Sequence, residues 1–368
     1  MRLGMFMHPL HDHRRGYHKL LEEDRAVIKC ADTNLFDEVW LGEHYSVPSE
    51  PVQSALLMFA TMIPETKHIT FGSAVHCLPY YHPAMVASWA AQFDHLSKGR
   101  FFMGIGAGGT PTDFELFNVT GKDLMEMVVE SIDMIHGIWA SDPPYSFQGK
   151  HWSFEIKEHI KSNMGIGGMA KPFQKPHPPV MIPAISRDSG SVRIGAQRGW
   201  QILSANFVAA DVVKSHWHQQ VSECEKIGIE PNPSLWRVGR TLLVTETDEE
   251  ARDYLRSPDC AIRWYFHWLL DAITYSGATQ ILKNDSDIDM PDQELSVDYC
   301  IDNLVISGSP KTVANGLAQF REEVGPFETL VTSHHDWVHE SLWRRHMELL
   351  SKDVMPRFRE SVGWLGGD

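Results

Sequence analysis

The feature that most constrains the fold of this chain is a regular alternation of short apolar runs with helix patterns. Eight of these runs have the length and composition of buried strands. They occupy residues 3–7, 38–41, 69–77, 101–105, 180–184, 200–204, 236–245 and 329–333. Helical chain follows each run, and strands that are covered by helices on both faces read as continuous apolar runs of this kind. The pattern predicts a parallel sheet with a helix after each strand.

Eight such units predict a closed (β/α)8 TIM barrel, a fold that usually takes about 250 residues. This chain has 368 residues, and the repeat breaks at 141–179 and 248–309. We interpret the two stretches as insertions into a single domain spanning 1–368, because neither carries a strand–helix–strand pattern of its own. They are expected to form the lid and wall of a substrate pocket; the alternative is that they serve packing or dimer contacts.

Composition limits the partners and the location of the protein. The chain has 33 Lys and Arg against 48 Asp and Glu, a formal net charge of −15, and it lacks a basic run, so nucleic acid is not an expected partner. It contains no stretch of eighteen apolar residues and no signal-like N-terminus, so we expect a cytoplasmic protein away from the membrane. Its five scattered cysteines, without a CxxC pair, predict neither a disulfide framework nor a cysteine zinc site.

Histidines gather where the predicted strands end, which is where a (β/α)8 barrel places its active site. His8 follows the first strand, His44 the second, His76 the third, and His335 with Trp337 the last. A single histidine at such a position is more often a bystander than a functional group. Because the carboxyl ends of the strands converge, we expect His8, His76, His335 and Trp337 to lie around one substrate pocket.

A metal site is one interpretation of these strand ends. His11, His13 and Asp336 resemble the outer ligands of amidohydrolase barrels. That site also needs histidines after the fifth and sixth strands, where this chain has 184–186 (Ala-Ile-Ser) and 204–206 (Ser-Ala-Asn). We therefore expect no metal.

Two short motifs are suited to a phosphorylated or flat ligand. Residues 104–109 satisfy GxGxxG after the fourth strand, although no clear helix opens at Gly109; a tight turn or close approach of the backbone to a flat ligand is the alternative. Ser189, Gly190 and Ser191 begin the helix after the fifth strand. They are either an ordinary helix cap or the donors of a phosphate site.

Several segments in the same order resemble the luciferase-like family of flavin-dependent oxidoreductases, over nearly the whole chain. The matching segments are 36–44 (FDEVWLGEH), 70–75 (TFGSAV), 78–83 (LPYYHP), 94–106 (DHLSKGRFFMGIG), 308–310 (GSP) and 335–337 (HDW). The His-Pro pair after the first strand, the glycine-rich loop and the HDW ending look most like the limonene and diketocamphane monooxygenase branch.

The resemblance implies a (β/α)8 barrel and an FMN-dependent monooxygenase. Reduced FMN comes from a separate flavin reductase and reacts with O2, and one oxygen atom passes to a small apolar organic substrate such as a ketone or terpenoid. We expect a homodimer. Two alternatives stay open, a deazaflavin (F420)-dependent hydride-transfer oxidoreductase and a non-catalytic flavin-binding protein.

The same resemblance assigns residues. His44 matches the family's active-site histidine and Glu43 stands beside it; the flavin site falls on Ala74, Val75, Gly106, Ala107, Arg187, Ser189, Gly190 and Ser191. A non-proline cis peptide is expected at Ala74-Val75. Gly106 stands where light-emitting members have cysteine, and Ala107 where they have a phosphate-binding arginine. We expect Arg187 or Arg193, near Ser189, to replace that arginine.

Overall fold

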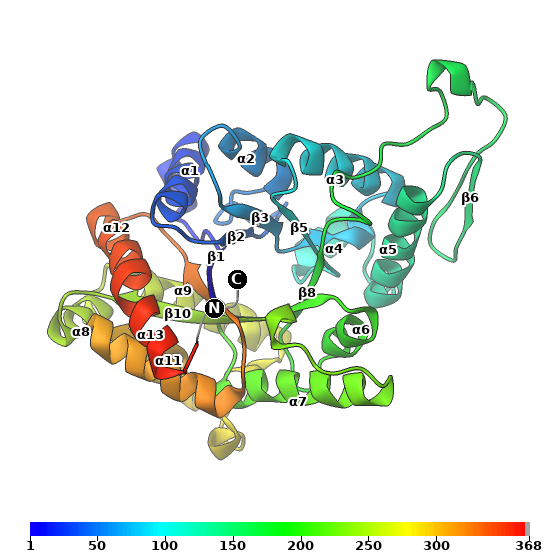
Figure 1. Ribbon diagram of the computed structural model, residues 1–368. Coiled ribbons are helices and arrows are strands. Elements are labelled where there is room, and N and C mark those ends of the chain that lie inside the picture. Colours follow the sequence, from blue (N-terminus) through cyan, green and yellow to red (C-terminus); the bar gives the residue numbers. More distant parts are fainter. Residues whose placement is uncertain (365–368) are drawn as a thin grey trace.

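Eight parallel strands close into a barrel in the computed structural model, which describes residues 1–364 (Figure 1). The barrel strands are β1 (Arg2–Met7), β2 (Glu38–Leu41), β3 (Thr70–Ser73), β5 (Phe101–Gly106), β8 (Val180–Ala184), β9 (Gln201–Ser204), β10 (Trp236–Val244) and β12 (Thr329–His334). Each strand pairs with the next in parallel, and β12 pairs with β1 to complete the ring. The predicted (β/α)8 architecture is confirmed.

Helices surround the barrel, as Figure 1 shows. They are α1 (Tyr17–Thr33), α2 (Ala55–Met62), α3 (Pro83–Ser97), α4 (Pro111–Leu116), α5 (Leu124–Ala140), α6 (Gly190–Arg198), α7 (Ala210–Lys226), α8 (Asp248–Arg256), α9 (Ala261–Ser276), α10 (Val297–Leu304), α11 (Pro310–Val324), α12 (Glu340–Leu349) and α13 (Met355–Ser361). Local sequence sets their ends. Pro83 begins α3 with His82 capping Ala84 N–H, and Lys98 and Gly99 end it with φ of 55° and 83°.

The third strand departs from its prediction as one run over 69–77. β3 ends at Ser73, and a two-residue strand β4 (His76–Cys77) resumes beside the end of β5. The Ala74-Val75 peptide between them is cis, as expected from the family resemblance. This link lies at the carboxyl end of the barrel, so the expected flavin residues Ala74 and Val75 are where ligands of such barrels bind.

The two stretches that break the repeat carry short elements of their own. Within 141–179, β6 (Tyr145–Gln148) and β7 (Ser153–Ile156) form an antiparallel hairpin that projects beyond α5 (Figure 1). Within 248–309, α8, α9 and α10 precede β11 (Val305–Gly308), which pairs in parallel with β10. Among residues 1–364, no helix has both the length and the apolar character that crossing a bilayer requires.

The amino-terminal half of the barrel interior is filled with side chains. Glu38 and Arg237 are buried there side by side, and Trp40 donates its indole N–H to Glu38 at 2.9 Å. The Arg237 guanidinium lies over the Phe102 ring, 4.9 Å from its centroid, and Phe102 stacks on Trp40. Because this layer occupies the floor, space for a ligand lies at the carboxyl end.

Candidate active site

A cavity of about 360 Å³ lies at the carboxyl end of the barrel. Loops after five barrel strands contribute its walls, and the size is within the range of about 300–1,000 Å³ that is usual for small-molecule sites. Six of the eight residues expected to bind the flavin line it: Ala74, Val75, Gly106, Ala107, Ser189 and Ser191. His44 and Glu43 line it as well. The structure therefore brings together residues that are up to 148 positions apart, from Glu43 to Ser191.

Buried polar atoms without a protein partner point to a ligand in this cavity. Tyr80 Oη and Asn206 Oδ1 belong to lining residues, and neither has a hydrogen-bond partner among the described residues. A buried polar group that is left unpaired costs about 1–3 kcal/mol. A ligand with polar edges and an apolar body would satisfy these atoms.

The start of α6 supplies a second polar feature. Ser189 precedes the helix, is 4% exposed and makes no side-chain capping hydrogen bond, so its hydroxyl is not used by the helix itself. Ser189 and Ser191 both line the cavity, at the helix end where backbone N–H groups and the helix dipole favour an anion.

The expected replacements for the missing arginine lie elsewhere. Arg187 Nη1 is 2.6 Å from Asp285 Oδ1, and Nη2 donates to the Lys283 carbonyl at 3.1 Å, so this side chain anchors the second inserted segment. Arg193 is largely exposed and lies 3.8 Å from Glu223. Neither is among the cavity-lining residues.

Glycines let the loop after β5 approach the cis peptide closely. A Cβ on Gly106 would lie 2.6 Å from Val75 Cγ2, and one on Gly108, which has φ +85°, would lie 2.3 Å from Tyr80 Oη. The helix that follows begins at Pro111 and has only six residues. The GxGxxG segment thus forms a closely packed part of the cavity wall, and only a six-residue helix follows it.

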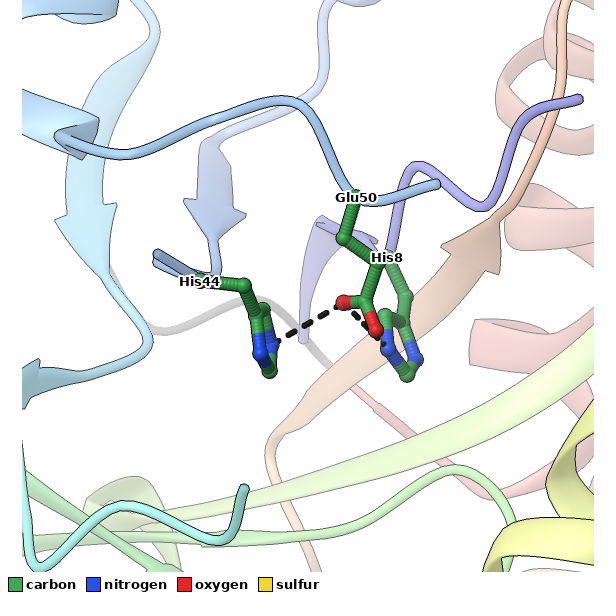
Figure 2. A group of neighbouring side chains, drawn as sticks. All are labelled: His8, His44 and Glu50. Atoms are coloured by element: carbon green, nitrogen blue, oxygen red, sulfur yellow. Dashed lines mark ion pairs between the residues drawn. The ribbon is translucent and has the colours of Figure 1, made fainter. Parts of the chain in front are cut away.

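His44 is joined to a carboxylate that the sequence did not single out. Its Nε2 lies 2.9 Å from Glu50 Oε2, and His8 Nε2 lies 2.8 Å from the same oxygen. Figure 2 shows the Glu50 carboxylate reaching between the two imidazole rings, which are stacked 6.2 Å apart. The other ring nitrogen of His44, Nδ1, lies 3.1 Å from Thr110 Oγ1.

Charge within this group favours protonated histidine. Burial by itself lowers the pKa of His44, but the Glu50 carboxylate more than offsets it, so the net pKa is raised. Burial likewise raises the pKa of Glu50, and the two imidazoles reverse this to hold it well below its usual range. Glu50, only 2% exposed, therefore stays ionised beside His44 and His8.

Glu43, which lines the cavity, is paired with the buried His76, which does not. His76 Nδ1 donates to Glu43 Oε2 at 3.0 Å, and Glu43 Oε1 accepts from the backbone N–H of Ala55 at 2.8 Å, where α2 begins. Both carboxylate oxygens are thus occupied by partners other than His44. The two side chains fix the loops after β2 and β3 relative to α2.

An aromatic cluster adjoins His8. The His335 ring stacks on Tyr265 with centroids 3.7 Å apart, and His8 lies 5.5 Å from Tyr265 and 6.1 Å from Trp268, both on α9. Burial lowers the pKa of His335 well below its ordinary value, so its ring is neutral. Trp337 packs against His334 and under Arg344. None of the four residues expected around the substrate pocket (His8, His76, His335 and Trp337) lines the cavity.

The inserted segments lie outside the lining of the cavity, and only the second comes close to His8. α9, from the second segment, supplies Tyr265 and Trp268 beside His8. Among the described residues, none that lines the cavity comes from 141–179, whose Trp152 and Phe154 pack against His82 instead. No residue of 248–309 lines the cavity either, so the expectation that the two segments wall the pocket is not met by this cavity.

The histidines that suggested a metal are held by charged neighbours. His11 lies between two carboxylates, with Nδ1 3.2 Å from Asp336 Oδ2 and Nε2 3.1 Å from Asp24 Oδ1, and Arg15 pairs with Asp336 at 2.9 Å. His13 is exposed. His11 and Asp336 therefore tie the loops after β1 and β12 to α1.

Sequence reasoning missed Glu50, Thr110, Tyr80 and Asn206. Glu50 lies nine residues after the end of β2, in a proline-containing loop that has no sequence periodicity to mark a functional side chain. Thr110 before Pro111 has the pattern of a plain helix start. The signal that was available was position alone, because all four follow barrel strands.

Comparison with known proteins agrees with this geometry. Residues 1–326 match the family model described as luciferase-like monooxygenase. The chain is 27% identical to 3,6-diketocamphane 1,6-monooxygenase of Pseudomonas putida, over 97% of this chain and 98% of that protein. It is 25% identical to limonene 1,2-monooxygenase of Rhodococcus erythropolis, over 98% of this chain and 87% of that protein.

Among solved structures, one similar protein is the oxygenating constituent of 3,6-diketocamphane monooxygenase, a type II Baeyer-Villiger monooxygenase in complex with FMN. Its TM-score is 0.87 at 26% identity, covering 97% of this chain and 98% of that one. The resemblance to the limonene and diketocamphane branch is confirmed. The chain belongs to the luciferase-like monooxygenase family and is an enzyme of that family.

Proposed function

We propose that this enzyme is the oxygenase component of a two-component system, which uses reduced FMN and O2 to oxygenate a small apolar ketone or terpenoid. The observation that carries the proposal is the cavity at the barrel mouth, whose lining combines apolar side chains, two residues with an unpaired buried polar atom and the start of a helix. The FMN complex of the similar oxygenating constituent supports the cofactor, and that protein's description as one constituent supports a separate reductase.

The residues present fit FMN. Ser189 and Ser191, with the backbone N–H of Gly190, would hold the phosphate at the start of α6. Ala74, Val75, Gly106 and Ala107 would leave room for the flat ring system, because Gly106 has no side chain and Ala74 and Ala107 have small ones. Tyr80 Oη and Asn206 Oδ1 would pair with polar groups of the cofactor.

Bound reduced FMN supplies the electrons that activate O2 for transfer of one oxygen atom. The chain's own residues exclude water and manage protons. The cavity has apolar walls formed by Phe6, Val75, Ile182 and Leu203. These walls limit the access of water, which would decompose a reactive oxygen species. His44, raised in pKa beside Glu50, is proposed to hold and move the proton that oxygen transfer requires, with Glu43 holding the adjacent loops.

The substrate is proposed to lie on the side of the cavity that faces His8. The aromatic cluster of His335, Tyr265 and Trp268 adjoins His8 there, outside the present lining of the cavity, and Trp337 packs beside it on His334. His76 is paired with Glu43 and does not line the cavity. Neutral rings suit an apolar molecule with one carbonyl or double bond better than a charged one.

A homodimer in the cytoplasm completes the proposal. Leu57 on α2 and Met85, Trp89 and Leu96 on α3 are exposed apolar side chains on neighbouring helices, which suits an interface between subunits. All five cysteines are free and buried, as in a reducing compartment. Light scattering of the purified protein measures the assembly, and a monomer at micromolar concentration would contradict it.

The proposed function is tested with chemically reduced FMN, O2 and a panel of ketones and terpenes, with product measured after one turnover. Oxygenated product with FMN, and none with reduced F420 supplied in its place, supports it. F420 that binds as well as FMN and transfers hydride would replace the proposal by the hydride-transfer alternative. Binding of FMN without turnover of any panel member in the presence of O2 would favour a flavin-binding protein.

Cofactor binding is tested separately by comparing FMN with riboflavin, which lacks the phosphate. Ser189→Ala is expected to weaken FMN about tenfold and to leave riboflavin unchanged, since one hydroxyl donor to phosphate is lost. Ser234→Ala, far from the cavity in a short turn before β10, is the matched control. Equal losses for both flavins would contradict the phosphate assignment.

A further inference from the structure

We infer that Glu50, His44 and Thr110 form a proton relay into the cavity, in which the Thr110 hydroxyl passes the proton and Glu50 is the positioning residue for His44. The inference rests on the proposed function and adds to it a route and two residues. No feature of the family resemblance assigned Glu50 or Thr110.

The geometry of the His44 ring carries the inference. Nε2 lies 2.9 Å from Glu50 Oε2 in an ion pair without hydrogen-bond alignment, and Nδ1 makes a hydrogen bond with Thr110 Oγ1 at 3.1 Å. With Nε2 facing the buried carboxylate, Nδ1 is the nitrogen that leads to the cavity, where Thr110 is a lining residue. A carboxylate on one imidazole nitrogen and a hydroxyl on the other is the arrangement with which hydrolases orient histidine and move protons.

Thr110 is free to take this role. It precedes α4 as the capping residue, a position at which threonine normally accepts a backbone N–H from the first helical turn. Here the side chain makes no such bond, and its hydroxyl meets His44 instead. Asp113 on the same helix binds the backbone N–H groups of Tyr45 and Ser46, so α4 is fastened to the segment directly after His44.

Glu50 supplies the charge that keeps His44 ready to donate. Its carboxylate is buried, and His44 and His8 approach one oxygen of it at 2.9 and 2.8 Å. Other charged and titratable groups also surround the pair. They are Glu43 and Tyr45 in the loop after β2, Asp113 on α4, His335 after β12, Tyr265 on α9, and His13 and Tyr17 around the start of α1. Of these, Glu43 and Asp113 act in the same direction as Glu50 and raise the pKa of His44.

The proton step balances without any further reactant. The Nδ1–H bond of the His44 imidazolium breaks as a new O–H bond forms on Thr110, and the original hydroxyl proton passes to an oxygen acceptor in the cavity. His44 goes from positive to neutral and Glu50 stays negative. His8 Nε2 lies 2.8 Å from the same carboxylate oxygen.

The first experiment tests Thr110 by product yield in a single turnover with reduced FMN and O2. Thr110→Val keeps the shape and removes the hydroxyl; we expect about a hundredfold less product per flavin, the scale of lost acid–base catalysis, at an unchanged Kd for FMN. Thr110→Ser should restore most of the yield. Thr112→Val makes the same chemical change on an exposed residue of α4 and is the control. A yield for Thr110→Val equal to that of Thr112→Val would overturn the relay.

The second experiment tests Glu50 without using activity. The His44 ring is titrated by NMR in flavin-free protein, with its signal assigned by comparison with His44→Gln. Glu50→Gln should lower the pKa of His44 by about one unit or more, as loss of an adjacent opposite charge does. Glu115→Gln, an equal charge change on the exposed side of α4, should leave it unchanged. An unchanged His44 titration in Glu50→Gln would overturn the positioning role.

The two readouts separate this inference from the proposed function. If no oxygenated product forms with any substrate while His44 still responds to Glu50→Gln, the function fails and the pairing stands. If Glu50→Gln does not fold, Glu50→Asp keeps the charge and withdraws it by one methylene; a His44 pKa between the wild-type value and that of free histidine supports the pairing, and an unshifted one opposes it.

Discussion

Arg237 and Glu38 form a two-point ion pair inside the barrel floor, with guanidinium Nε and Nη2 at 2.8 and 2.9 Å from the two carboxylate oxygens. Both side chains are buried, at 0% and 1% exposure. A buried pair gains little over apolar packing, but each member depends strongly on the other.

Removal of one member of this pair should therefore be costly. Arg237→Met leaves the Glu38 carboxylate uncompensated, and we expect the free energy of unfolding to fall by about 3–5 kcal/mol. Urea denaturation measures it. Arg344→Met removes a guanidinium whose partner, Glu340, is exposed, and should cost at most about 1 kcal/mol. Similar losses for the two variants would contradict a structural role for the floor pair.

His44→Ala should reduce product formation about a hundredfold while FMN binding and the fold persist, because a positioned proton donor contributes on that scale. The measurement is product per reduced flavin together with hydrogen peroxide, since oxygen that is not transferred is released in that form. His82→Ala, which removes a histidine from the start of α3 outside the cavity, is the control for a lost imidazole. Unchanged coupling in folded His44→Ala would refute the role.

Gly106→Ala should weaken FMN binding about tenfold or more. The new Cβ would lie 2.6 Å from Val75 Cγ2, so we expect Val75 to be displaced. Overpacking of this kind costs about 1–3 kcal/mol. Gly109→Ala is the matched control, because a Cβ there meets nothing within 4 Å. Adding Val75→Ala to Gly106→Ala should recover part of the affinity. Equal Kd values for the two glycine variants would show that the approach of these loops does not shape the site.

Stability should fall as pH rises through the pKa of His11. Burial alone lowers this pKa, but Asp24 and Asp336 raise it to about 9 from the ordinary value near 6.5. A group whose pKa is higher in the folded than in the unfolded protein gives its full stabilisation at pH values below the unfolded pKa. This stabilisation is lost as the pH rises through the folded pKa. From these two values, about 3 kcal/mol should disappear between pH 6.5 and about 9.

The measurement is the free energy of unfolding across that pH range for wild type and His11→Gln. The variant should lack this slope and be less stable at pH 6.5. His13→Gln, which changes an exposed neighbour, should retain the wild-type slope. An identical slope in all three proteins would mean that His11 does not gain its charge on folding.

The strands and their order could be predicted because burial on both faces gives each strand an unbroken apolar run. The family resemblance assigned His44, Ala74, Val75, Ser189 and Ser191 to the site, and all five line one cavity. The break after Ser73 could not be predicted from pattern, since apolar residues continue across it.

The sequence did not predict which side chains contact one another across the fold. Arg187 is close to Ser189 along the chain, yet its side chain reaches Asp285, 98 positions away. Glu43 is adjacent to His44, yet it binds His76 and the start of α2. The carboxylate that does meet His44 is Glu50, brought back by a loop whose course depends on tertiary packing rather than on local preference.

The packed layer of Trp40, Phe102, Glu38 and Arg237 closes the barrel at its amino-terminal end, so ligands enter from the carboxyl end. Two ligands that share this single entrance must bind in sequence, and the one that lies deeper binds first and dissociates last. Flavin and organic substrate should therefore bind in a fixed order, and excess substrate that binds before the flavin should obstruct the entrance and cause substrate inhibition.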